Sequence, residues 1–103
     1  MTENELGIVI GTIMSTEKVA GTNRLHIIKI DIGDKEVQIA SGVPGDFEPN
    51  VLVGKQVPIK IDVDPVSIRG IESNARFLAV SGENKETVML FPEKSVPNGS
   101  KLW

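Results

Sequence analysis

The chain has 103 residues, and its 11 lysines and arginines against 14 aspartates and glutamates give a formal net charge of −3. A chain of this length has room for one core, so we expect a single domain over residues 1–103. It has no cysteine, which excludes disulfides and thiolate metal sites, and its acidic balance argues against non-specific binding of polyanions.

Residues 1–5, MTENE, are polar and acidic, unlike the basic and apolar start of a signal peptide. No apolar stretch approaches the roughly 20 residues that are needed to span a bilayer. We therefore expect a cytoplasmic protein with no membrane partner.

The first half of the chain predicts strands. LGIVIGTIM (6–14) is continuously apolar, as in a strand that is buried on both faces or bent at its two glycines. IKIDIG (28–33) alternates isoleucines with charged residues. A turn at Gly33-Asp34 follows it, so residues 24–40 predict a β-hairpin.

The second half continues this pattern after a loop. Residues 41–56 are rich in proline and glycine and allow one helical turn between Glu48 and Leu52. PIKIDVD (58–64) alternates again, and FLAV (77–80) indicates a buried strand directly after a polar cluster. Short strands separated by turns every 8 to 12 residues predict a small, closed or partly closed β-barrel.

The segment VMLFPEKSVPNGSKLW (88–103) is unusually apolar for the end of a sequence. We expect its apolar side chains to be covered, either by the barrel wall or by a second subunit. The residues predicted for such a subunit interface are Leu90, Phe91, Val96, Leu102 and Trp103. Asn98-Gly99-Ser100 indicates a turn.

The sequence offers little material for an enzyme. His26 is the only histidine, and its place in an alternating run indicates a partly exposed strand position. Neither a P-loop nor a dinucleotide-binding glycine motif is present. Asp62 and Asp64 share one face of a strand, but no third metal ligand is indicated. We therefore predict no catalytic residue, no metal and no cofactor.

Three arginines are candidates for binding, since a guanidinium makes planar two-point contacts with phosphate: Arg24, Arg69 and Arg76. Arg76 lies close in sequence to Ser73 and Asn74, whose side chains both donate and accept hydrogen bonds. The residue types alone fit a polar binding patch and a structural turn equally well.

The order of the motifs IVIGTIMSTEKV, RLHIIKIDIGDKEVQIASGV, LVGKQVPIKIDV, DPVSIRGIESNARFLAV and PNGSKLW resembles the tRNA-binding domain family. IASGV and RGIES are its most specific pieces. The family occurs at the C-terminus of methionyl-tRNA synthetases, in cofactors of synthetase complexes and as free-standing proteins. The resemblance implies an all-β, five-stranded OB-fold barrel with a short helical turn and a C-terminal extension, which binds tRNA by its shape.

The resemblance also implies site residues. Ser73 matches a family position on the RNA-facing surface, Asn74 replaces a glutamine there, and Arg76 replaces an apolar residue. Arg24 stands where the family has lysine, and Arg69 matches a basic residue before glycine. Two family motifs are missing, because residues 19–23 are VAGTN and residues 64–67 are DPVS.

Two functions follow from these observations. The first is a non-catalytic tRNA-binding protein that acts as a homodimer, as free-standing relatives do, with a possible aminoacyl-tRNA synthetase partner. The alternative is a chaperone-like or protein-binding dimer on the same fold, which the acidic balance of the chain suits. An enzyme is the least favoured reading, because an acid, a base and a nucleophile are not present as a set.

Overall fold

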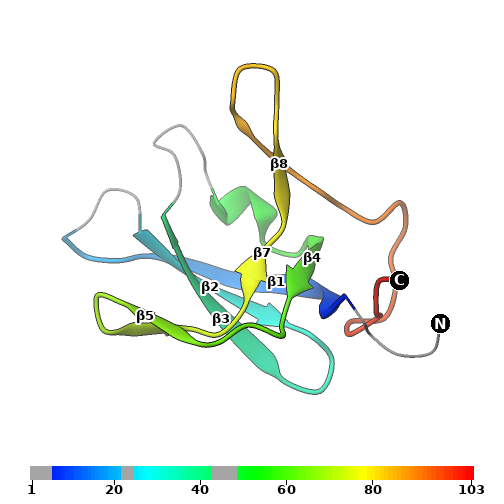
Figure 1. Ribbon diagram of the computed structural model, residues 1–103, viewed down its shortest axis with the longest axis horizontal. Coiled ribbons are helices and arrows are strands. Elements are labelled where there is room, and N and C mark those ends of the chain that lie inside the picture. The colour runs from blue at the N-terminus through cyan, green and yellow to red at the C-terminus, as the bar shows by residue number, and fades with distance from the viewer. Residues whose placement is uncertain (1–5, 22–24, 43–48) are drawn as a thin grey trace.

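The computed structural model describes residues 6–21, 25–42 and 49–103. Five strands form one curled, antiparallel sheet (Figure 1). In spatial order they are β3 (Glu36–Gly42), β2 (Leu25–Asp31), β1 (Ile8–Lys18), β4 (Gln56–Lys60) and β7 (Arg76–Phe77). This curled sheet confirms the all-β, OB-like fold.

The β2–β3 hairpin forms as its alternation predicts. Ile28 pairs with Ile39 and Ile30 pairs with Val37 across the two strands, and all four side chains are buried in the core. Lys29 between them is exposed to solvent. The period of two therefore separates the core face of this hairpin from its solvent face.

Strand β1 is long enough to pair with two different strands of the barrel. Its first half pairs with β4, from Ile8↔Lys60 to Thr12↔Gln56, and its second half continues along β2. The register with β2 shifts between Ile13 and Ser15. A shift of this kind bends a strand and increases its twist, which helps the sheet to curl.

The barrel closes between β3 and the segment that leads into β7. Asn74 donates its backbone N–H to Gln38 O at 3.0 Å, and its Oδ1 accepts the Gln38 N–H at 2.9 Å. Ser73 Oγ accepts the Ala40 N–H at 3.1 Å. Gln38 Nε2 donates to the Glu72 carbonyl at 2.8 Å. Side chains therefore make much of the connection that a strand ladder makes elsewhere in the sheet.

The C-terminal segment lies along the first half of β1. Gly99 N–H donates to Ile10 O at 2.7 Å, and Leu102 N–H donates to Ile8 O at 3.0 Å. The backbone of this segment is therefore hydrogen-bonded to the barrel wall. Packing on the barrel wall was one of the two arrangements expected, the other being packing on a second subunit. Val96 and Leu102 are partly buried there, whereas Trp103 is 89% exposed.

The prediction of a buried strand over residues 77–80 is wrong beyond Phe77. The chain turns away from the barrel and forms a hairpin of β8 (Ala79–Ser81) and β9 (Thr87–Met89), which projects at the top of Figure 1. Both residues Ala79 and Val80 are exposed. An apolar run cannot by itself distinguish a barrel strand from an arm of a projecting hairpin.

The helical turn expected before residue 52 is the 3-10 turn η1 (Pro49–Leu52). It sets Leu52 into the core beside β1. Among the described residues, no helix has the length and apolar character that crossing a bilayer requires.

We expect Gly99→Ala to detach the C-terminal segment from the barrel. Gly99 has a φ of 91°, and a Cβ there would lie 2.6 Å from Ile32 O. Gly54→Ala is the matched control, because Gly54 has a φ of 89° but open space around the added methyl. In both variants an alanine has to adopt a positive φ, which costs about 1–2 kcal/mol.

Urea unfolding should show that Gly99→Ala lowers the free energy of unfolding by at least about 1 kcal/mol more than Gly54→Ala, since overpacking typically costs 1–3 kcal/mol. Equal losses in the two variants would contradict the close approach of the segment to Ile32.

Candidate nucleic-acid interface

A groove of about 350 Å³ lies between β3 and β7, beside a short hairpin of β5 (Val66–Ile68) and β6 (Ile71–Ser73). It is lined by residues 39–41 of β3, Val66 and Ile68 of β5, and Arg76 and Phe77 of β7. The hairpin belongs to the connection between the fourth and fifth barrel strands. OB-folds bind oligonucleotides with that connection and the face of their second and third strands.

Arg76 brings a charge to this mainly apolar groove. Its side chain is exposed, and its backbone pairs with Lys60 of β4. Within residues 6–21, 25–42 and 49–103 the one ion pair joins Lys60 and Asp62, so Arg76 has no carboxylate partner there. Its donors remain available for a ligand, although Asp64 also lines the groove.

Arg69 lies at the tip of the β5–β6 hairpin, which projects at the lower left of Figure 1. Its φ is 53° and that of Gly70 is 80°. A two-residue hairpin turn with two positive φ values matches the twist of its strands, and glycine takes the second position at no steric cost. This turn holds the exposed Arg69 side chain next to Ile68, a residue of the groove wall.

Ser73 and Asn74 are used inside the chain. Ser73 is buried. Its Oγ accepts the Ala40 N–H and donates to Ala75 O at 3.5 Å. Asn74 Oδ1 holds the Gln38 N–H. The polar cluster before β7 is thus explained by closure of the barrel, and the tRNA contacts expected of these two side chains stay predictions.

The structure brings some of the predicted residues together. Arg76 and Ser73 line the same groove, and Arg69 lies on the hairpin that forms one of its walls. Arg24 lies outside the described residues.

Sequence reasoning missed the contribution of β3 to the groove. Ser41 lines it, and the register places His26 of β2 directly opposite Ser41. Cross-strand partners share one face of a sheet, so His26 belongs to the same face. The signal was available, because Ser41 lies within the motif IASGV that carries much of the family resemblance.

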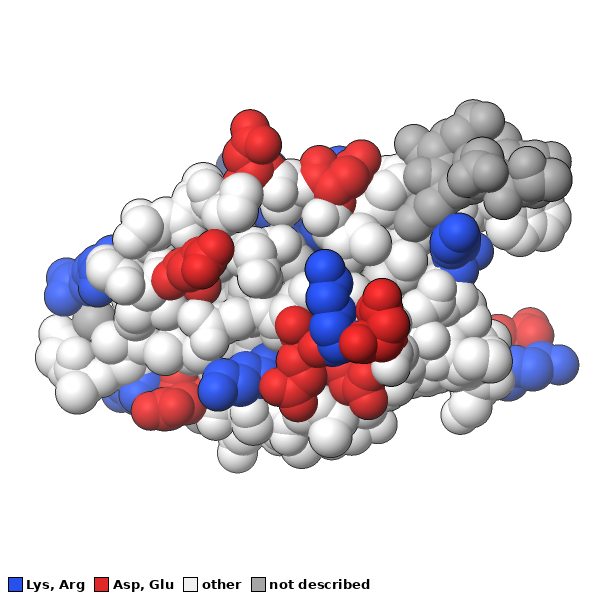
Figure 2. All heavy atoms as spheres, turned by 90° about the horizontal axis from the view of Figure 1, so that it is seen from below, with Lys and Arg blue, Asp and Glu red and all other residues white. Residues whose placement is uncertain are grey.

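Charges are mixed on the face that Figure 2 shows, which is Figure 1 seen from below. Acidic and basic side chains alternate across it, and carboxylates gather near its centre. The Lys60 ammonium donates to Asp62 Oδ1 at 2.7 Å, and this contact lowers the pKa of the Asp62 carboxyl below its ordinary value. Such a surface offers individual donors and no broad positive field.

The described residues contain no group of three or more side chains that could hold a metal ion. Asp62, one of the two aspartates considered as ligands, is engaged with Lys60 instead.

Residues 8–101 match the family model described as "Putative tRNA binding domain". The chain belongs to this tRNA-binding domain family. The match covers all of the barrel strands, the β8–β9 hairpin and the segment that lies along β1.

Similar proteins agree with this assignment. The chain is 38% identical over 98 residues to a methionine–tRNA ligase of Archaeoglobus fulgidus, which covers 95% of this chain and 15% of that protein. The crystal structure of a MetRS related protein from Pyrococcus horikoshii matches with a TM-score of 0.85 at 24% identity, covering 93% of this chain and 88% of that one. The chaperone CsaA of Bacillus anthracis matches with a TM-score of 0.79 at 25% identity, covering 93% and 89%.

The two kinds of relative differ in length. The chain spans about one-seventh of the methionine–tRNA ligases that it matches, but nearly all of the two solved structures. The likeness to the Pyrococcus protein supports the fold, and the ligases share the tRNA-binding domain with this chain.

Proposed function

We propose that this chain, over residues 1–103, is a non-catalytic module that binds folded tRNA in the groove between β3, the β5–β6 hairpin and β7. The observation that carries the proposal is the exposed Arg76, which lines the groove at the usual ligand position of an OB-fold and has no carboxylate partner among the described residues. Membership of the tRNA-binding domain family supports the same ligand.

The charge of the groove favours recognition by shape. Structured RNA is bound mainly through contacts to phosphates and 2′-hydroxyls, which require well-placed donors more than a high net charge. Arg76 lies in the groove and Arg69 at the tip of its hairpin wall, so the two guanidiniums can contact different phosphates of one ligand. An association with a methionine–tRNA ligase belongs to the same proposal, because the ligase relatives contain this domain.

Arg76→Ala should weaken binding of total tRNA about tenfold, since hydrogen bonds to charged groups contribute about 1.5–3 kcal/mol. Arg69→Ala should have a smaller effect of the same kind. Each substitution should also reduce the slope of log K against log salt by about one. Filter binding at several salt concentrations measures both quantities.

Lys35→Ala is the control, because Lys35 is an exposed cation in the turn between β2 and β3 and does not line the groove. Unchanged affinity and salt slope in both arginine variants, or an equal loss in the Lys35 variant, would contradict the groove as the RNA site.

The apolar walls of the groove support a second candidate function. Val66, Ile68 and Phe77 line it, and an extended polypeptide would bury such side chains favourably. A solved chaperone shares the fold. If an unfolded polypeptide binds and tRNA does not, the protein-binding function replaces the first one.

We further propose that the chain forms a homodimer through the projecting β8–β9 hairpin. An isolated two-stranded hairpin is at best marginally stable in water, and this one exposes Val80, Val88 and Leu90. Trp103 adds a further exposed apolar side chain. Phe91 is left out of this surface, because it follows the β8–β9 hairpin in the chain and its ring lies 5.6 Å from Lys55 Nζ, just before β4.

Val80→Asp or Leu90→Asp should therefore shift the protein toward monomer in sedimentation velocity, since each places a charge in the proposed interface. Val51→Asp is the control, because Val51 is 62% exposed on η1, outside the hairpin. A mass that is the same in all three variants and the parent would contradict the proposed interface.

A further inference from the structure

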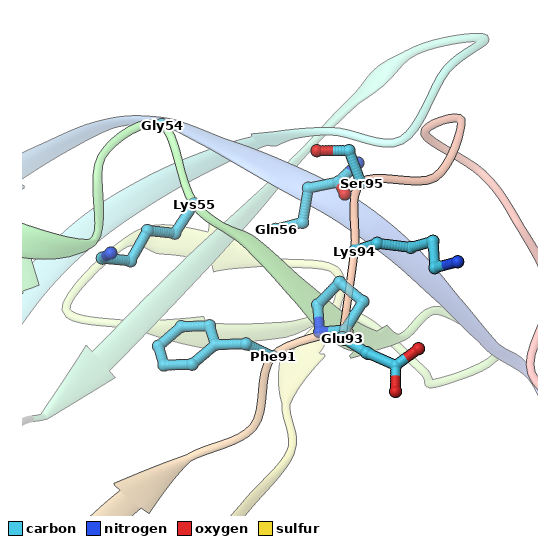
Figure 3. Close-up of a pocket in the computed structure, with 8 residues that line it drawn as sticks. Gly54, Lys55, Gln56, Phe91, Glu93, Lys94 and Ser95 are labelled. Carbon is cyan, nitrogen blue, oxygen red and sulfur yellow. The ribbon is translucent and has the colours of Figure 1, made fainter.

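A second cleft, of about 420 Å³, lies between the turn that leads into β4 and the segment that follows β9 (Figure 3). It is lined by residues 54–56 and 91–95. It shares no lining residue with the groove described above.

Hydrogen bonds within the chain hold both walls of this cleft. Gln56 Nε2 donates to Val96 O at 2.6 Å, and Gln56 Oε1 accepts the Val96 N–H at 3.1 Å, which ties the 91–95 wall to β4. On the other wall, Gly54 N–H donates to Ile13 O at 2.8 Å. Walls that are fixed before a ligand arrives lose less conformational freedom when it binds.

Lys55 and Phe91 give the cleft its chemistry. Lys55 Nζ lies 5.6 Å from the centroid of the Phe91 ring, which is 51% exposed. In Figure 3 the Glu93 carboxylate points away from these two side chains. The ion pair between Lys60 and Asp62 is the only one in the described part of the chain, so the Lys55 ammonium has no carboxylate partner there.

We propose that this cleft binds an unpaired nucleotide of the RNA, with the base against Phe91 and a phosphate at Lys55. An aromatic face next to a cation is the combination that holds single-stranded nucleic acid, by stacking and by attraction to phosphate. The volume of about 420 Å³ lies within the range that is usual for small-ligand sites. An apolar ligand would leave the ammonium unused, and an inorganic anion would leave the ring unused.

This inference rests on the proposed binding of tRNA and adds a second contact to it. The groove would hold the folded part of the molecule, and the cleft would hold a nucleotide that is not base-paired. The same chemistry would suit a free mononucleotide, so the test has to distinguish the two sources.

The test uses the full chain and three probes: a fluorescein-labelled single-stranded RNA trinucleotide, AMP as a competitor, and tRNA with its unpaired 3′ end intact or trimmed. Phe91→Leu removes the ring and keeps an apolar side chain, and Lys55→Gln removes the charge. Met14→Leu and Lys35→Gln are the matched controls, because both parent residues are exposed and lie outside the cleft.

Phe91→Leu should weaken binding of the trinucleotide about tenfold, within the range that single stacked bases contribute. Lys55→Gln should lower the salt slope by about one, which a purely structural role would not change. Trimming the 3′ end should weaken tRNA binding to the parent but not to Phe91→Leu, and AMP should compete poorly. The control variants should behave as the parent.

No binding of the trinucleotide by the parent, or equal effects in the control variants, would overturn the inference. Strong competition by AMP would overturn an RNA strand as the source of the nucleotide, and no effect of trimming would overturn the 3′ end as that source. If the parent binds tRNA, and Phe91→Leu and Lys55→Gln bind the RNA probes as tightly as the parent does, the cleft fails while the proposed function stands. If the trinucleotide binds through Phe91 and tRNA does not bind, tRNA binding fails and the cleft stands.

Discussion

The barrel is held closed by one short segment whose side chains and backbone both form hydrogen bonds with β3. Ser73 and Asn74 accept the N–H groups of Ala40 and Gln38, and both acceptors come from side chains where the rest of the sheet uses carbonyls. A buried N–H group without a partner costs about 1–3 kcal/mol. That cost is large for a domain whose total stability is on the order of 5–15 kcal/mol.

This closure also positions the groove. The segment that bonds to β3 connects the β5–β6 hairpin to β7. Arg69 precedes the bonding residues in the chain and Arg76 follows them, so the same contacts help to position both arginines. The segment RGIESNAR therefore contains both the residues that fix the scaffold and the arginines that we propose for binding. Placing contact residues on a rigid scaffold reduces the freedom that is lost when a ligand binds.

Alternation of apolar residues was enough to predict the β2–β3 hairpin, because one face of it is buried and the other is not. The continuous apolar run FLAV gave a wrong prediction at Ala79 and Val80, which lie on a hairpin that leaves the barrel. The roles of Ser73 and Asn74 were equally out of reach, since their backbone partners lie 33 to 36 residues earlier in the chain. The groove combines β3, β5 and β7, and only the fold, implied here by the family motifs, places these together.

Amide hydrogen exchange at Ala40, in the parent and in Ser73→Ala, tests the closure most directly. We predict that the Ala40 N–H of the parent exchanges as slowly as the amides of the central strands, and that Ser73→Ala exposes it to fast exchange while those amides stay protected. Fast exchange in the parent, or the same slow exchange in both proteins, would contradict the account.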